Sequence, residues 1–147
     1  MKNILLLTCL WISLFSNAKA VVNVKDYPLA YQTALSWQKS WDQNKASESR
    51  QFVSKGMLDV LSFADIQKAL SERRANLGVL KNRKLKETIS HGQIYSFPDA
   101  EYVAFIFTSN YENKKNVNEL IRVIKEGDNW LIFSDLLLEK GQKAVGD

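Results

Sequence analysis

Hydrophobic residues follow a helical pattern in the first half of the sequence. Residues 27–54 have a helical composition, with apolar positions such as Trp37 and Trp41 separated by polar ones. Asp26 and Pro28 predict the start of a helix, because Asp can cap free amides and Pro suits a first turn. The polar run 42–44 predicts a break in the helical stretch, and Gly56 predicts its end.

A second helix is predicted over residues 63–77. Ser62 and Asp65 have the spacing of a capping box, with Asp in place of the usual Glu. One helical stripe of apolar residues follows, at Phe63, Ile66, Ala69, Leu70 and Leu77. Gly78 predicts the end of this helix, because glycine readily adopts the positive φ common at helix ends.

Beyond Gly78 the apolar residues alternate with polar ones, which predicts strands. The expected strands cover residues 79–97, 101–111, 117–126 and 129–138, and short turns connect them. Sequential strands joined by short turns form an antiparallel meander. Residues 102–107 are apolar at every position, so we expect this strand to be central or covered on both faces.

The order of the elements predicts an α+β fold. N-terminal helices precede a sheet, and a curved antiparallel meander packed around the helices would bury both apolar surfaces. We expect residues 21–147 to form one domain, because these 127 residues are enough to bury a sizeable core.

Residues 1–20 have the features of a cleavable secretory signal. Lys2 precedes an apolar run over residues 4–15, and Ala18-Lys19-Ala20 supplies a small-x-small cleavage pattern. The run is too short to cross a bilayer as a helix, which takes about 20 residues. We therefore expect a periplasmic or secreted bacterial protein that begins at Val21 and has no stable membrane insertion. Cys9 is the single cysteine, and Thr8 before it does not suit a lipid-attachment motif.

Cleavage after Ala20 would leave a chain with no cysteine, which excludes disulfides and thiolate metal ligands. Removing Lys2 and Lys19 lowers the formal net charge from +4 to +2. This near-balance does not favour nucleic acid as a partner, since a phosphate-binding surface needs more basic residues.

Three segments carry a resemblance to a known family of bacterial exported proteins. The first is residues 74–85, with Arg74, Leu77, Gly78 and Arg83 in an R-x-x-L-G-x-x-x-x-R pattern. The others are residues 101–103 and 111–119, followed by Gly127 and Trp130. This pattern resembles domain of unknown function 4019. The resemblance implies a cone-shaped fold similar to nuclear transport factor 2, or cystatin-like, with a sheet wrapped around helices and a pocket. It implies no activity.

Glu119 is the most informative polar position in the sequence. Strand alternation places it on one face with Val117, Ile121 and Val123, which should be buried. A buried carboxylate needs a cation, a proton or a solvated pocket. Arg74, at the edge of the helical stripe, is the expected cation. A structural ion pair between helix and sheet is one interpretation, and ligand contact by Arg74, Arg83 or Glu119 is the other.

The sequence contains no catalytic or metal-binding motif that we can assign. His91 is the single histidine, so a site of several histidines cannot form, and Ser90 and Gly92 beside it predict an exposed position. A glycine-rich phosphate loop, a Gly-x-Ser-x-Gly elbow and a His-Glu-x-x-His motif are all missing from the sequence. We expect no cofactor. Trp37 and Trp41, four residues apart, are expected in the core.

Three functional hypotheses remain open. The leading one is a non-enzymatic exported domain that binds a small ligand or a protein partner. The second is an enzyme that uses Glu119 as an acid or base. The third is a structural module that self-associates through the apolar last strand, which ends at Leu136-Leu137-Leu138. A cavity that reaches Glu119 would favour the first two over a closed structural ion pair.

Overall fold

A computed structural model describes residues 19–92 and 97–139 of the chain. The predicted apolar signal run and Cys9 lie outside the described residues. The elements in chain order are β1 (Lys19–Val21), η2 (Val24–Asp26), α1 (Pro28–Asp42), η3 (Ala46–Phe52), α2 (Lys55–Leu58), α3 (Phe63–Leu77), β2 (Leu80–His91), β3 (Tyr102–Tyr111), β4 (Val117–Glu126) and β5 (Asn129–Leu138). The predicted α+β class is confirmed.

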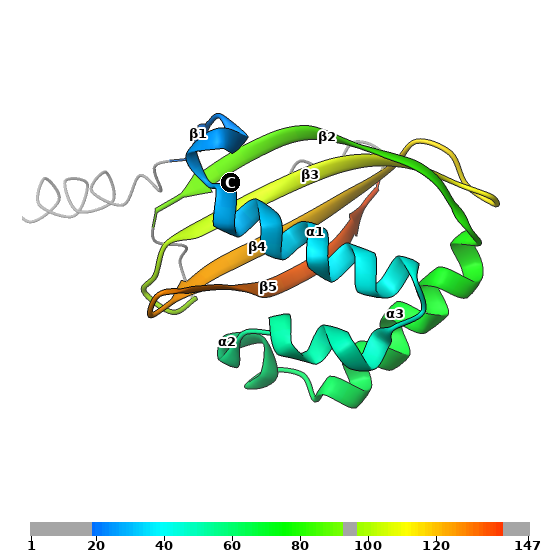
Figure 1. Cartoon of the computed structure of the whole chain (residues 1–147), viewed down its shortest axis with the longest axis horizontal. Helices are drawn as coiled ribbons and strands as arrows, with labels where there is room; N and C mark the ends of the chain where they lie inside the picture. The colour runs from blue at the N-terminus through cyan, green and yellow to red at the C-terminus, as the bar shows by residue number, and fades with distance from the viewer. Residues whose placement is uncertain (1–18, 93–96, 140–147) are drawn as a thin grey trace, which may run out of the picture.

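The described strands form one antiparallel sheet with the order β1-β2-β3-β4-β5. Helix α1 crosses one face of this sheet, and α3 leads to the start of β2 (Figure 1). The four long strands are therefore the predicted meander. The short strand β1 was not predicted, because its three residues show no recognisable alternation.

The main core lies between α1 and the sheet. It contains Ala30, Ala34, Trp37 and Trp41 from α1, together with Val103, Phe105, Phe107, Ile121, Val123 and Ile132 from three strands. A second buried cluster of Ile89, Ala104, Ile106 and Leu120 comes from the alternate positions of the sheet. The central strand β3 is thus buried on both faces, as its apolar run predicts.

The cap of α3 agrees with the sequence pattern. Ser62 Oγ accepts a hydrogen bond from the Asp65 backbone N–H at 3.1 Å and donates one to the Asp65 carboxylate at 2.6 Å. Gly78 follows the helix with a φ of 77°. Ile66, Leu70 and Leu77 are buried, whereas Ala69 is exposed.

Three expectations about single residues are wrong. Asp26 does not cap α1: it lies in η2, and the N-cap is Tyr27, which makes no side-chain capping bond. Gly56 lies inside α2, where its N–H donates to the Glu126 carboxylate at 3.2 Å. His91 is only 7% exposed. Local sequence does not determine whether a helix starts near Asp26 or ends near Gly56, and the burial of His91 depends on residues that are distant in the chain.

Candidate functional site

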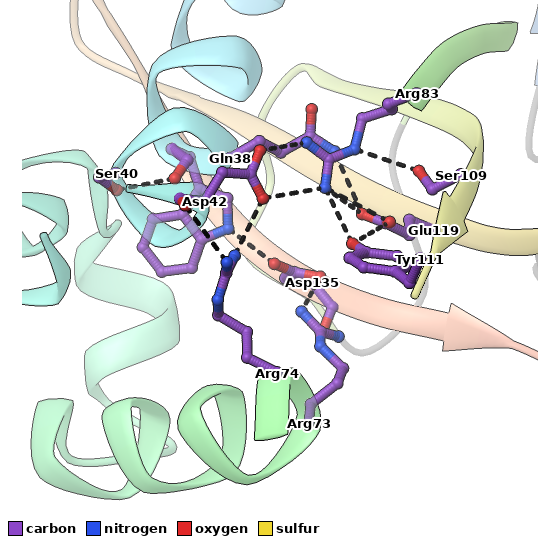
Figure 2. A network of polar contacts seen from close by, with 11 residues as sticks. Gln38, Ser40, Asp42, Arg73, Arg74, Arg83, Ser109, Tyr111, Glu119 and Asp135 are labelled. Carbon is purple, nitrogen blue, oxygen red and sulfur yellow. Dashed lines mark hydrogen bonds and ion pairs between the residues drawn. The ribbon is translucent and has the colours of Figure 1, made fainter. Parts of the chain in front are cut away.

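A buried ion pair between β2 and β4 forms the centre of a polar network (Figure 2). Arg83 Nη2 lies 3.2 Å from Glu119 Oε2, and the two side chains are 12% and 5% exposed. Arg83 Nε also donates to Ser109 Oγ on the intervening strand at 3.2 Å. The alternation of β4 that predicted a buried Glu119 is confirmed.

Asp42, the last residue of α1, joins the helices to this pair. Its Oδ2 accepts from Arg83 Nη1 at 2.6 Å, and its Oδ1 accepts from Arg74 Nη1 at 2.9 Å. Arg74 Nη2 also donates to the Asp42 backbone carbonyl at 3.3 Å. A carboxylate at a helix C-terminus is disfavoured by the helix dipole. The two guanidinium groups compensate for that position and tie α1 to α3 and β2.

Two neutral side chains complete the hydrogen bonding of Glu119. The Tyr111 hydroxyl donates to Glu119 Oε1 at 2.5 Å, and Gln38 Nε2 donates to Oε2 at 3.4 Å. Burial raises the pKa of Tyr111, and the Glu119 carboxylate raises it further. Burial lowers the pKa of Arg83, but Glu119 and Asp42 more than reverse that effect, so its pKa lies above its ordinary value. Both groups therefore stay protonated and keep donating to the carboxylates.

A second ion pair lies on the α3 side of the network. Arg73 Nη2 contacts Asp135 Oδ1 on β5 at 2.7 Å, and Trp37 Nε1 donates to Asp135 Oδ2 at 2.7 Å. The Asp135 side chain is 6% exposed. This pair therefore links both α1 and α3 to β5.

The network is balanced in charge. Three arginines, Arg73, Arg74 and Arg83, face three carboxylates, Asp42, Glu119 and Asp135. Burying charges is costly unless opposite charges and hydrogen bonds compensate for the lost solvation. Each of these carboxylates receives such compensation from within the protein, so none of them requires a ligand as a counterion.

Within the described residues, several hollows border the network. The one that reaches Glu119 has a volume of about 20 Å³, close to what one water molecule needs. A groove of about 390 Å³ between α1 and β2 is lined by Gln38, Asp42 and Arg83 among others. A hollow of about 550 Å³ between the end of α1 and α3 is lined by Trp41 and Arg74 among others. Glu119 lines only the smallest of these.

The predicted pairing of Arg74 with Glu119 is wrong. The structure brings Arg83 and Glu119 together, and it places Arg74 against Asp42 instead. Periodicity fixed the face on which each side chain lies, but it could not choose between two arginines. The sequence indicates Asp42 only as part of a helix break. Its position four residues after Gln38, on the same helix face, is the one signal that could have identified it.

A comparison with family profiles gives one match, which covers residues 33–134. The matching family is described as Protein of unknown function (DUF4019). The chain belongs to the DUF4019 family. The DUF4019 match contains every residue of the network except Asp135, which directly follows it. Neither the curated proteins nor the solved structures that were compared give a match to the chain.

Among the described residues, no helix is long and apolar enough to cross a membrane.

Proposed function

We propose that this DUF4019 protein is an exported, non-enzymatic domain that binds a small, largely apolar ligand in the groove between α1 and β2. Export rests on the order of Lys2, the apolar run and the Ala18-Lys19-Ala20 pattern. In this proposal the groove is the mouth of a cone-shaped fold like that of nuclear transport factor 2.

The observation that carries the proposal is the composition of the groove. Tyr31 and Leu35 from α1 face Leu85 from β2 and Phe107 from β3, which gives the groove apolar walls. Polar groups lie at one end, where Gln38, Lys39, Asp42 and Arg83 line it. Small-molecule sites commonly combine apolar walls with a few polar groups, and about 390 Å³ is within their usual range.

Gln38 supplies a further argument for a ligand with a hydrogen-bond donor. Its side chain is 4% exposed and donates to Glu119, while its Oε1 has no hydrogen-bond partner among the described residues. In Figure 2 this oxygen points away from Glu119. An unpaired buried acceptor costs free energy. Because this oxygen is itself buried, a donor on a ligand reaches it only if the Gln38 side chain moves toward the groove.

The alternative of an enzyme that uses Glu119 is less well supported. Its carboxylate already accepts hydrogen bonds from Tyr111, Arg83 and Gln38, and the cavity beside it holds no more than about one water. A catalytic acid or base must come within hydrogen-bond distance of its substrate. Nothing of substrate size fits beside Glu119 in this arrangement.

The proposal can be tested with N-phenyl-1-naphthylamine, a neutral apolar dye that fluoresces when it leaves water. We expect the purified domain to enhance its fluorescence in a saturable manner. Leu35→Glu places a charge on the apolar wall and should weaken dye binding about tenfold or more. Leu29→Glu is the matched control, because Leu29 lies on the same helix, is 66% exposed and does not line the groove.

Equal dye binding by the two variants, or no saturable binding by the unmodified domain, would contradict the assignment of the groove. Native mass spectrometry of the protein purified from the periplasm would then give the mass of any ligand that remains bound.

A further inference from the structure

The hollow between the end of α1 and α3 differs in chemistry from the groove. Trp41, Ala46, Ala75 and Val79 provide its apolar surface, and the Val79 side chain is 60% exposed. The remaining lining residues are Asn44, Ser71, Arg74 and Gly78. Arg74 is thus the one charged residue that lines a hollow of about 550 Å³.

Arg74 retains donors that the network does not use. A guanidinium group has five N–H donors. The contacts of Arg74 within the described residues are Nη1 to the Asp42 carboxylate and Nη2 to the Asp42 carbonyl. Its side chain is 20% exposed, so solvent or a ligand can reach the group.

Trp41 provides a second unused donor at the wall of the same hollow. The residue is 6% exposed, and its indole Nε1–H has no hydrogen-bond partner among the described residues. A buried donor without an acceptor is destabilising. Because this N–H is itself buried, an acceptor beside Arg74 reaches it only if the indole ring shifts toward the hollow.

Among the described residues, no acidic residue lines the hollow, although Asp42 lies 2.9 Å from Arg74 and already compensates part of its charge. Glu112 Oε2 is 3.4 Å from the Val79 backbone N–H and is exposed, and Glu112 is not among the residues that line the hollow. Solvent screens an exposed charge of this kind, so it weakens an anion site without abolishing it. The wall itself presents donors and apolar surface.

From these observations we propose that this hollow is a second binding site, for a small molecule that carries a carboxylate on an apolar body. A guanidinium group pairs with a carboxylate through two parallel hydrogen bonds, and the N–H donors of Arg74 that Asp42 leaves unused can form them. A dianionic phosphate would need more donors than this wall offers. The apolar body would lie against Trp41, Ala75 and Val79. This site is separate from the groove between α1 and β2, and its occupancy does not depend on the proposed function.

Three compounds of one size separate charge from shape: benzoate, benzamidine and benzyl alcohol. We expect benzoate to shift the indole N–H resonance of Trp41 and the amide resonance of Ala75 in a saturable manner. Benzamidine carries the opposite charge and benzyl alcohol is neutral, so neither should produce a saturable shift. Equal responses to benzoate and benzamidine would overturn the proposal, as would the lack of a saturable response to benzoate.

The variant that tests the site is Ser71→Glu. Ser71 lines the hollow three residues before Arg74, so a glutamate there can pair with Arg74 and occupy it. We expect benzoate binding to weaken about tenfold or more. Ala69→Glu is the control, because Ala69 is exposed on the same helix and does not line the hollow. Unchanged binding in Ser71→Glu would overturn the proposal.

Leu35→Glu distinguishes this site from the groove. The substitution should leave benzoate binding within about twofold, because Leu35 lines only the groove. Loss of benzoate binding in Leu35→Glu would place the carboxylate in the groove and overturn the second site. If Leu35→Glu loses only dye binding and keeps benzoate binding, the result supports a separate carboxylate site.

Discussion

Arg83 and Glu119 meet across β3, a strand to which neither residue belongs. Arg83 pairs in register with Ser109 of β3, and Glu119 pairs with Phe107 of the same strand. The side chains of Arg83 and Glu119 therefore reach toward each other over β3, on the face of the sheet that α1 covers. Asp42 at the end of α1 contacts Arg83 from the helix side. The ion pair holds β2 and β4 in one register against α1.

The first prediction concerns the energetic coupling of this pair. Removing one partner of a buried ion pair costs about 3 to 5 kcal/mol, because the other charge stays buried without compensation. We expect Glu119→Gln and Arg83→Gln each to lower the free energy of unfolding by an amount near that range. The double variant should lose much less than the sum of the two, as measured by urea unfolding.

The control for this set of single and double variants combines Arg74→Gln with Glu119→Gln. These two residues make no direct contact in the described structure, since Arg74 is bound to Asp42. Asp42 and Arg83 connect these two residues within one network, so we expect some coupling, but less than between Arg83 and Glu119. Stronger coupling of Glu119 to Arg74 than to Arg83 would show that the network is arranged differently in solution.

The second prediction is a loss of stability at alkaline pH that depends on Tyr111. Burial, and then the Glu119 carboxylate, raise the pKa of Tyr111 above its ordinary value of about 10. The folded state keeps the proton at a pH where the unfolded state loses it. This contribution is therefore complete below about pH 10 and is lost as the pH rises further.

Tyr111→Phe should flatten the decline of the unfolding free energy above about pH 10. Burial also raises the pKa of Tyr102, to about 12, so we expect this variant to remove only part of the slope. Identical slopes for the native protein and Tyr111→Phe would mean that Tyr111 is not held protonated by the network. Urea unfolding at a series of pH values provides the measurement.

The third prediction compares two glycines with positive φ. Gly78 has φ 77° and ψ −159°, and a Cβ there would lie 3.0 Å from Glu112 Cβ. Gly127 has φ 61°, and a Cβ would meet nothing within 4 Å. We expect Gly78→Ala to cost about 2 to 3 kcal/mol and Gly127→Ala about 1 kcal/mol, because only the first adds a steric clash to backbone strain. Equal melting temperatures for the two variants would contradict this comparison.

The fourth prediction is that the protein is exported and that its exported form begins at Val21. Ala18-Lys19-Ala20 is the one good small-x-small site after the apolar run. Cleavage there would remove Lys19 and Ala20 of β1, which pair with His91 and Ser90 of β2. Intact-mass measurement of the exported protein tests this prediction, and a retained Met1 or a lipid on Cys9 would refute it.

The fifth prediction follows from the cysteine content of the processed chain. Cys9 is the single cysteine and lies before the predicted cleavage site. Thiol reductants should therefore leave the melting temperature of the exported protein unchanged. A shift on reduction would indicate that Cys9 is retained.

Local patterns in the sequence determined most of the secondary structure. The bounds of β4 and β5 agree with their alternation, and Ser62 and Gly78 mark the ends of α3. These features depend on residues within a few positions of one another, so they can be predicted from the sequence alone. The first predicted strand extends to Phe97, whereas β2 ends at His91, because alternation carries little information about where pairing stops.

Burial of polar residues could be predicted only where periodicity was strong. Glu119 has apolar neighbours at every second position of a long strand, and it is buried. His91 has only a serine and a glycine beside it, and its burial depends on β1 and β3, which pair with the end of β2. The physical reason is that a side chain's exposure is set by the layers above it, which come from distant segments.

The sequence by itself determined the element order, the antiparallel meander and the need for a cation, a proton or a solvated pocket at Glu119. Only the tertiary structure decided which cation that is. An ion pair forms between groups whose backbones are held a few ångströms apart, and strand register and helix placement set that distance. The register of β2 against β3 brings Arg83 to Glu119, while the end of α1 places Asp42 against Arg74.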